Sequence, residues 1–389
     1  MGIFYWYSIL IAVGLCESLD SPADVGADSE VKNTEFDLNK TELLAAFVVF
    51  RHGDRTPDQE ELDKLPLKEL NNEKLFYPYG KKALTNKGKQ RAFLVGKYLR
   101  DRYNGTISSL YLPNESHIQT TDYSRTKMTA LTALAALFPP PPAQRWNPDL
   151  NWQPVPYDTP AYNVDNFLYY YNCPRYIQLR NKIYELPEFQ KRLAPYERLF
   201  KNLSDKAQSN ITTAEDVFDL DNLFQTLGNV GVLTPQWAVD VMPQIKEVTK
   251  IEYAAEFYTV ELIRLASGVL MGDILNATNA IIDGSDKVPK LWLFSAHENN
   301  VAALMAASGV FYPHQPKYGS TISLEMRKDL VTGKYGVLTV YAAEAGGPGV
   351  ILPIRGCGSK PLCDYDSFVS MTQEIRISMS DYKKECSIK

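Results

Sequence analysis

The chain has 389 residues, of which 45% are apolar and 12% aromatic. That composition is typical of a globular protein with enough apolar material for one or two packed domains. The formal net charge of −5 is spread along the chain without a long basic run, which argues against nucleic acid and anionic membranes as partners.

The N-terminus carries the pattern of a secretory signal. Residues 3–15 are largely apolar and are followed by small or polar residues, so residues 1–18 are predicted to be a signal peptide. A buried first strand and a short membrane anchor are the alternatives. No second apolar segment of about 20 residues is recognised downstream, which favours a secreted, extracellular product over a lysosomal one.

Glycan acceptors and cysteines agree with export. Asn-x-Ser/Thr acceptors for glycosylation stand at Asn39, Asn104, Asn114, Asn202, Asn210 and Asn276. The cysteines that remain after signal removal are Cys173, Cys357, Cys363 and Cys386. Four cysteines can pair in three ways, and a local Cys357–Cys363 loop would leave Cys173 to pair with Cys386. Their spacing matches no C-x-x-C metal motif, and no metal or other cofactor is expected.

Strands and helices alternate in the first part of the chain. In chain order, the predicted elements are a buried strand at 44–50, a helix within 84–103 behind Thr85 as N-cap, a short strand at 118–121, and a helix at 124–137 that Pro139–Pro142 terminates. This order is typical of an α/β domain.

The last part of the chain returns to this pattern. Its predicted elements are a strand at 287–295, a helix at 298–308, and a hairpin at 321–344 that turns near Thr332–Gly333. Residues 161–285 carry only helical patterns, among them a capping box Thr212-x-x-Glu215 and a continuous helix at 251–275. We therefore predict an α/β domain of residues 41–160 and 286–389, with a helical cap inserted at 161–285. Its central sheet should be mixed, mostly parallel, and flanked by helices.

The stretch FVVFRHGDRTP, residues 47–57, carries the chemistry. Its polar part directly follows a strand, at the carboxyl edge where ligands bind in open α/β sheets. Arg51 and Arg55, separated by a flexible Gly53, can converge on one phosphate. Their fixed charge disfavours protonation of His52, so a neutral ring can attack phosphorus in acidic solution.

Other residues are expected near this edge. His297 follows the strand at 287–295, whereas Arg125, at the start of a helix, could be either an anion ligand or a solvated charge. Asp54 should shape the loop, since a carboxylate against phosphate would repel it. The alternative for residues 51–57 is a solvated charged loop, but a chance match to R-H-G-x-R-x-P is expected in on the order of one chain in ten thousand.

Residues 51–57 resemble the signature of the histidine acid phosphatase family. Further similar segments are residues 122–140, NCPRY at 172–176, SAHEN at 295–299 and GCGSKPLC at 356–363. The resemblance covers roughly residues 43–386 and points to the secreted, prostatic, lysosomal and insect venom types. It implies that His52 forms a phosphohistidine, that Arg51, Arg55, Arg125 and His297 bind phosphate, that Cys357 and Cys363 close a disulfide loop, and that the chain is a homodimer.

The chain departs from the family pattern at two places. Most relatives have His-Asp where this chain has His297-Glu298, and vertebrate relatives often carry a third disulfide whose cysteines are absent here. We expect Glu298 to act as the proton donor, with burial and the phosphate raising its pKa against the pull of the arginines. The alternative is that Glu298 only caps the following helix and that another carboxyl, such as Asp54, donates the proton.

We therefore expect a secreted acid phosphatase that hydrolyses phosphate monoesters, either small molecules or phosphoproteins, without a metal. A non-catalytic secreted binder of phosphorylated ligands or host tissue is the first alternative. A transferase resembling the phosphoglycerate mutases is the second.

Overall fold

The computed structural model describes residues 36–358 and 360–387, so the predicted signal peptide lies outside the described residues. The strands are β1 (Thr41–Arg51), β2 (Ser116–Thr120), β3 (Leu291–Ala296), β4 (Thr321–Asp329), β5 (Tyr335–Ala342), β6 (Val350–Leu352) and β7 (Cys363–Asp364). They form one sheet in the order β2-β3-β1-β4-β5-β6, with β7 paired to β5.

The sheet is mixed, as predicted, but it is not mostly parallel. Strands β2, β3 and β1 run parallel, whereas the pairs β1–β4, β4–β5, β5–β6 and β5–β7 are antiparallel. The prediction of parallel strands fails at β4, because the chain after α11 returns to the carboxyl end of β1, where Arg51 N donates to the Ser320 carbonyl O over 3.0 Å. Strand β4 begins there, with Thr321 paired to Phe50, and therefore runs antiparallel to β1. The parallel part of the sheet is the part that builds the site described below.

The helices cover both faces of the sheet and form the region between β2 and β3. The α-helices are α1 (Gln59–Asp63), α2 (Asn86–Arg102), α3 (Ser124–Leu137), α4 (Pro174–Ile183), α5 (Pro187–Leu193), α6 (Glu197–Ala207), α7 (Ala214–Gly228), α8 (Gln236–Val239), α9 (Met242–Glu256), α10 (Val260–Ile282), α11 (Glu298–Ala307), α12 (Tyr365–Met371) and α13 (Met379–Cys386). Helix α3 has the predicted bounds. Helix α2 begins behind Thr85, whose hydroxyl accepts from Gly88 N over 3.1 Å.

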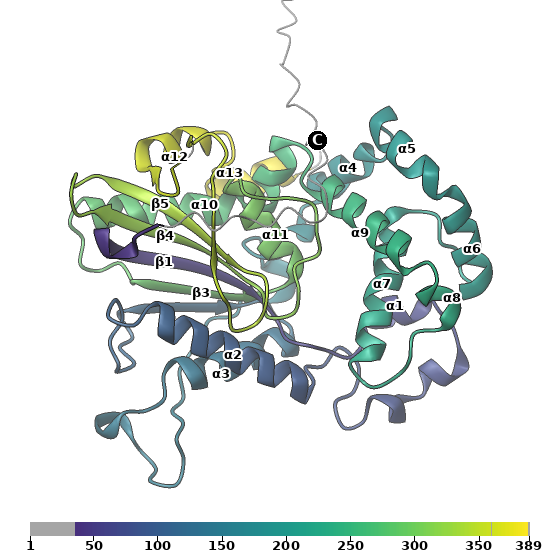
Figure 1. The fold of residues 1–389 in the computed structure, drawn as a ribbon, viewed down its shortest axis with the longest axis horizontal. Helices are drawn as coiled ribbons and strands as arrows, with labels where there is room; N and C mark the ends of the chain where they lie inside the picture. Colours follow the sequence, from purple (N-terminus) through teal and green to yellow (C-terminus); the bar gives the residue numbers. More distant parts are fainter. Residues whose placement is uncertain (1–35, 359, 388–389) are drawn as a thin grey trace, which may run out of the picture. The chain divides into compact units, whose positions relative to one another are not determined.

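Strand β1 is buried on both faces. Val48 and Phe50 belong to the core cluster that includes α2 and α3, and Phe47 and Val49 belong to the cluster that includes α10 and α11. Figure 1 shows α2 and α3 on one side of the sheet and α10 and α11 on the other. Because successive side chains of a strand point to opposite faces, the near-continuous apolar run at 44–50 is what a strand covered on both faces requires.

Between Tyr162 and Ile282 the regular elements are helical, in keeping with the pattern of residues 161–285. One core cluster joins α6, α7 and α9 with Leu62 to Phe76, the segment that follows the RHGDRTP motif. Helix α10 packs instead in the core cluster of the sheet. The bounds of a separate cap domain stay a prediction.

Two details of the helical region differ from the prediction. The capping box is formed by Thr213 and Asp216 rather than by Thr212 and Glu215, since the Thr213 hydroxyl accepts from Asp216 N over 3.1 Å. The continuous helix at 251–275 is broken between α9 and α10, where Thr259 caps α10. An N-cap hydroxyl provides a partner for one of the N–H groups that a helix start leaves free.

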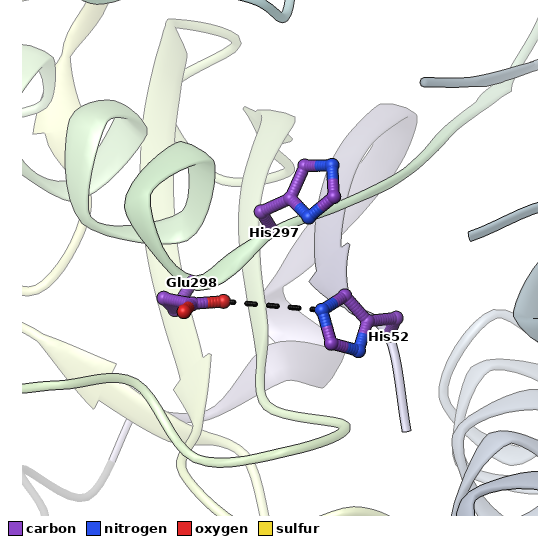
Figure 2. Close-up of side chains that lie close together, drawn as sticks. All are labelled: His52, His297 and Glu298. Atoms are coloured by element: carbon purple, nitrogen blue, oxygen red, sulfur yellow. Dashed lines mark ion pairs between the residues drawn. The ribbon is translucent and has the colours of Figure 1, made fainter. Parts of the chain in front are cut away.

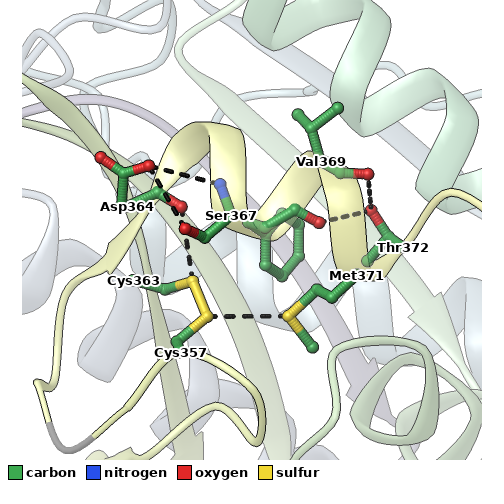
Figure 3. The surroundings of a disulfide bond; sticks show 8 residues. Cys357, Cys363, Asp364, Ser367, Val369, Met371 and Thr372 are labelled. Atoms are coloured by element: carbon green, nitrogen blue, oxygen red, sulfur yellow. Dashed lines mark hydrogen bonds between the residues drawn. A yellow bond between two sulfur atoms is a disulfide. The ribbon is translucent and has the colours of Figure 1, made fainter.

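The four cysteines of the described part form two disulfides, Cys173–Cys386 and Cys357–Cys363. The first joins the start of α4 to the end of α13. Figure 3 shows the second beside Met371 of α12, whose sulfur lies 3.6 Å from Cys357 Sγ. Among the glycan acceptors, Asn202 is half-buried and the other five are exposed.

Helix α10 is more apolar than the sequence analysis allowed. Among the described residues it is the one helix long and apolar enough to cross a membrane, which corrects the expectation that no second such segment exists. However, 56% of its most apolar window is buried inside the protein, where it packs in the cluster of α11 and β1. Packing against the sheet therefore accounts for its composition.

Candidate active site

The carboxyl ends of parallel strands meet at one site. Arg51 of β1 and Ala296 of β3 are paired in register, and His52 N donates to the Ala296 carbonyl O over 3.0 Å. The residues that follow, His52 and His297, are therefore neighbours, with ring centroids 5.4 Å apart. Strand β2 leads into α3, which carries Arg125 in its first turn. The sheet register thus explains why these distant segments converge.

The contacts of the buried His52 ring determine its tautomer. Its Nδ1 lies 2.8 Å from the Gly53 carbonyl O, which can only accept, so Nδ1 carries the proton of the neutral ring. Nε2 keeps its lone pair and accepts from Arg125 Nε over 3.2 Å. Burial, together with Arg125, His297 and the other arginines, holds the pKa of His52 well below its usual value. His52 therefore presents an unprotonated nitrogen in acidic solution.

The loop that carries His52 is clamped onto α2. Gly53 is not flexible as expected, because a Cβ at this position would lie 2.2 Å from the Gly88 carbonyl O. Only glycine permits so close an approach of the two backbones. Asp54 is buried and pairs with Arg91 Nε over 2.5 Å. Its carboxylate is thus directed at α2, where it shapes the loop.

Three arginines surround His52. Each of them has a buried guanidinium nitrogen without a hydrogen-bond partner: Arg51 Nη2, Arg55 Nε and Arg125 Nη1. These side chains are 1%, 5% and 7% exposed, respectively. Arg51 is fixed from two sides, since Nη1 donates to the Pro316 carbonyl O over 2.7 Å and the guanidinium lies 4.0 Å from the Tyr318 ring centroid. Buried donors without partners are costly, so three at one place indicate an oxyanion site.

Two carboxylates beside these arginines were missed by the sequence analysis. Glu61 of α1 accepts from Arg55 Nη1 over 2.9 Å and from Nη2 over 2.5 Å. The Asp58 carboxylate lies 3.5 Å from Arg55 and 3.7 Å from Arg125. Burial lowers the pKa of Arg55, but the carboxylates of Glu61 and Asp58 outweigh burial and raise this pKa well above its usual value. The signal in the sequence is Asp58-x-x-Glu61, which indicates a capping box, and the two residues do form one at α1.

Glu298, the first residue of α11, points toward His52 (Figure 2). Its Oε2 lies 2.9 Å from Arg51 Nε and 4.0 Å from His52 Nε2. Burial raises the pKa of Glu298, but the positive charges of Arg51 and Arg55 outweigh burial and hold this pKa below its usual value. Burial alone therefore does not keep this carboxyl protonated, and the expected rise of its pKa depends on the phosphate. A proton donor here needs the added negative charge of a phosphate.

The tautomer of His297 follows from a chain of hydroxyls. Thr126 Oγ1 donates to the carbonyls of Thr121 and Tyr123 over 2.9 Å. It must therefore accept from Thr121 Oγ1, 3.0 Å away, and Thr121 in turn must accept from His297 Nε2 over 3.0 Å. Nδ1 of the neutral ring is then unprotonated, and burial and the arginines hold the pKa of His297 well below its usual value.

A cation would fit this site poorly. His52, His297 and Glu298 offer ligand atoms that all lie within 4.8 Å of one another, which is a minimal set for a metal ion. However, the arginines described above border the same space, and Arg51 already pairs with Glu298. Positive charge at this distance repels a metal ion and attracts an anion.

Comparison with known proteins agrees with an anion site of this kind. The chain matches the family model of the histidine phosphatase superfamily (branch 2) over residues 42–337. It is 33% identical to prostatic acid phosphatase of Bos taurus over 359 residues, which are 90% of this chain and 88% of the relative. It is 30% identical to a venom acid phosphatase of Apis mellifera over 341 residues, 86% of each chain. Lysosomal acid phosphatase of Rattus norvegicus is 29% identical over 348 residues, 88% of this chain and 79% of the relative.

Solved structures share the fold at lower identity. The phytase of Citrobacter braakii aligns with a TM-score of 0.64 at 17% identity, over 90% of this chain and 100% of the phytase. The phytase of Hafnia alvei, in complex with myo-inositol hexakis sulphate, aligns with a TM-score of 0.64 at 16% identity, over 90% of this chain and 99% of the phytase. The family model, the acid phosphatase relatives and the shared fold lead to one conclusion: the chain belongs to branch 2 of the histidine phosphatase superfamily.

Proposed function

We propose that this protein is a secreted acid phosphatase that hydrolyses phosphate monoesters through a phosphohistidine on His52. The observation that carries the proposal is the unprotonated Nε2 of His52, which lies among three arginines with unpartnered buried donors. A nucleophile and preorganised positive charge are the two requirements of metal-free phosphoryl transfer.

In the first step, His52 Nε2 attacks phosphorus and forms an N–P bond while the ester O–P bond breaks. The electron pair of that bond stays on the leaving oxygen, which takes a proton from Glu298. The non-bridging oxygens bind to Arg51, Arg55, Arg125 and His297. Water then attacks phosphorus and forms a new O–P bond while Glu298 accepts a proton from that water. The N–P bond breaks, its electron pair returns to His52 Nε2, and phosphate leaves.

The tautomer of His297 supports an acidic pH optimum. Because its Nδ1 carries no proton in the neutral ring, it can accept a hydrogen bond from a protonated phosphate oxygen. The second pKa of a phosphate monoester is about 6, so one oxygen is protonated in acidic solution. The low pKa of His52 keeps the nucleophile available in the same range.

Secretion is the other part of the proposal. Disulfides persist mainly in oxidising compartments, and the described part contains two of them. Five of the six glycan acceptors are exposed, as glycosylation requires. Small phosphomonoesters or phosphoproteins are the proposed substrates, and the homodimer stays a prediction.

Phosphate release from p-nitrophenyl phosphate at about pH 5 tests the proposal. The wild-type protein should release phosphate, and His52→Ala should not. The matched control is His117→Gln, a histidine of β2 that contacts Trp292 at 4.6 Å between ring centroids. This variant should stay active. Full activity of His52→Ala would reject the proposal, and a wild-type protein that binds phosphate without turnover would favour the non-catalytic binder.

A further inference from the structure

Three tyrosines form a cluster beside Arg125 and His297. The tyrosine cluster consists of Tyr123, Tyr162 and Tyr169. The ring centroids of Tyr162 and Tyr169 are 4.5 Å apart. The ring centroid of Tyr123 lies 5.8 Å from that of Tyr162 and 6.3 Å from that of Tyr169. Such separations are typical of aromatic rings in contact.

The tyrosine cluster directly adjoins the proposed phosphate site. The Arg125 guanidinium lies over the Tyr123 ring, 4.3 Å from its centroid. The His297 ring meets Tyr123 edge to face, at 5.0 Å between centroids. Tyr123 therefore contacts two of the proposed phosphate ligands, and a group esterified to a phosphate held there would lie within reach of the cluster.

The cluster is both fixed and accessible. Tyr162 N donates to Asp122 Oδ2 over 3.3 Å, and the Tyr162 carbonyl O accepts from Asn172 Nδ2 over 2.7 Å. The Tyr162 hydroxyl also donates to the Tyr169 hydroxyl over 2.9 Å. Tyr162 nevertheless remains 43% exposed. A large apolar ring that is held in place but left open to solvent next to a binding site is suited to contact a ligand.

The cluster carries no charge that would repel a phosphate ester. Burial raises the pKa of Tyr123 to about 12, so the hydroxyl stays protonated in acidic and neutral solution. The rings offer flat apolar faces with polar hydroxyl tips, and planar aromatic groups pack on such faces in stacked or edge-to-face geometry.

We propose that Tyr123, Tyr162 and Tyr169 form a subsite for the leaving group of the substrate, and that this subsite selects a planar aromatic ring. The inference rests on the proposed phosphatase function and adds the chemical class of the leaving group. Tyr123 holds the inner edge of the subsite against the phosphate ligands, and Tyr162 provides its exposed ring. Leaving groups without an aromatic ring lose these contacts.

Benzyl phosphate and cyclohexylmethyl phosphate separate this selection from leaving-group chemistry. Both are esters of primary alcohols of similar size, so both need the same proton in the transition state, but only benzyl phosphate has a planar ring. The wild-type protein should favour benzyl phosphate in kcat/KM by about three- to tenfold, the scale of one or two aromatic contacts. Tyr162→Leu should bring that ratio close to one, whereas Tyr162→Phe should retain it. The control Trp146→Leu changes an exposed aromatic side chain beyond the C-terminal end of α3, and its ratio should equal that of the wild type.

Two results would overturn the subsite. One is an equal preference ratio in the wild-type protein and Tyr162→Leu. The other is an equal loss on both substrates in Tyr162→Leu together with weaker competitive inhibition by inorganic phosphate, which would show that Tyr162 supports the phosphate site instead. If the wild-type protein released phosphate from p-nitrophenyl phosphate but from neither ester, the subsite would be rejected and the proposed function kept; if it released phosphate from none of the three, the proposed function would be rejected as well.

Discussion

Arg125 donates a hydrogen bond from its Nε to Nε2 of His52 over 3.2 Å. The same nitrogen of His52 is the one that we propose to attack phosphorus, so in that mechanism Arg125 lies beside the group to be transferred. A phosphate that binds between His52 and Arg125 would accept the hydrogen bond that Arg125 Nε now donates to His52. The guanidinium that orients the His52 ring would then also bind the phosphoryl group. The arginines should therefore matter more in the transition state than in binding.

Replacement of Arg51, Arg55 or Arg125 by Ala should cost roughly 2–4 kcal/mol of transition-state stabilisation, the scale of one preorganised donor. Lys should recover only part of the loss, because a point charge cannot reproduce the planar fork. The measurement is kcat/KM on p-nitrophenyl phosphate. Arg192→Ala, at an arginine of α5 that pairs with Glu188, is the control and should behave as the wild type. Wild-type kcat/KM in Arg125→Ala would remove this arginine from the site.

The buried Arg55–Glu61 pair should be required for stability as well as for activity. Both side chains are almost fully buried, and Glu61 accepts from both Nη atoms of Arg55. Glu61→Leu should lower the free energy of unfolding by about 3–5 kcal/mol, because it leaves an uncompensated buried charge. The double variant Arg55→Met with Glu61→Leu should regain much of that loss, since both charges are then removed.

Denaturant unfolding of the single and double variants measures this coupling. Glu247→Gln is the control, because its pair with Lys250 is exposed and should contribute less than about 1 kcal/mol. Additive losses in the double variant would mean that Arg55 and Glu61 do not stabilise each other.

The His52 ring should remain neutral far into the acidic range. An unperturbed histidine has a pKa of about 6.5, and burial, Arg125, His297 and Arg51 lower that of His52. The unprotonated form, which is the reactive one, is therefore retained as the pH falls below 6.5, and the acid limb of kcat/KM should lie lower still. Nitrogen-15 spectra of the histidine rings, with His52→Ala to assign the signal, measure the titration. A His52 ring that titrates near its unperturbed value would contradict the tautomer and charge described here.

The local signals in the sequence predicted the elements that build the centre of the site. The Pro139–Pro142 run marks the end of α3, and the Thr85 cap marks the start of α2. Motifs that directly follow a strand also indicated where Arg51, His52 and His297 would meet. These predictions succeed because caps, prolines and strand ends act over a few residues.

The features that the sequence did not predict depend on contacts between distant segments. The apolar pattern of 251–275 continues without interruption through Phe257, and Tyr253 of α9 even shares a core cluster with α10. The break is visible only in the backbone, where α9 ends at Glu256 and Thr259 caps α10. Glu61 looks like an ordinary capping residue until α1 is placed beside Arg55. Tyr123 and Tyr162 are far apart in the sequence, and nothing near either one indicates the contact.

Two buried carboxyl groups of α9 should make the protein less stable in alkaline solution. Burial raises the pKa of Glu252 to about 8 and that of Glu256 to about 7, despite the nearby Arg180. The folded state thus retains protons that the unfolded state releases near pH 4.5. This contribution to stability is complete below about pH 4.5 and is lost as the pH rises through about 7 and 8.

The melting temperature measured between about pH 5 and about pH 8 should therefore fall in the wild-type protein. It should fall less in the variant Glu252→Gln with Glu256→Gln, which has no carboxyl to ionise. Glutamine can still accept from Tyr184, the hydroxyl partner of Glu252 at 2.5 Å, and from Tyr171, a partner of Glu256 at 2.9 Å. Equal slopes in the two proteins would show that these carboxyl groups do not set the alkaline limit.

The last prediction concerns Glu298, where the protein's own charges oppose the proposed role. Arg51 Nε lies 2.9 Å from its carboxylate, and the arginines keep the pKa of Glu298 low. A bound phosphate brings negative charge that offsets these arginines and so raises the pKa of Glu298. We therefore expect Glu298 to donate a proton only in the complex with substrate, and to matter only when the leaving group needs that proton.

Glu298→Gln, assayed on two substrates, tests this role. Gln keeps the length of the side chain and an oxygen that can accept from Arg51, but it has no proton to transfer. Phosphorylation of His52 by an alkyl phosphate should slow by roughly 10²-fold or more, the usual scale of general acid catalysis. Phosphorylation by p-nitrophenyl phosphate should stay fast, because its leaving group is stable as an anion. Glu298→Asp should keep a carboxylic acid and retain more activity on the alkyl ester than Glu298→Gln does. Equal losses of Glu298→Gln on both substrates in this step would instead assign Glu298 to the positioning of Arg51, and no loss on either would remove it from the mechanism.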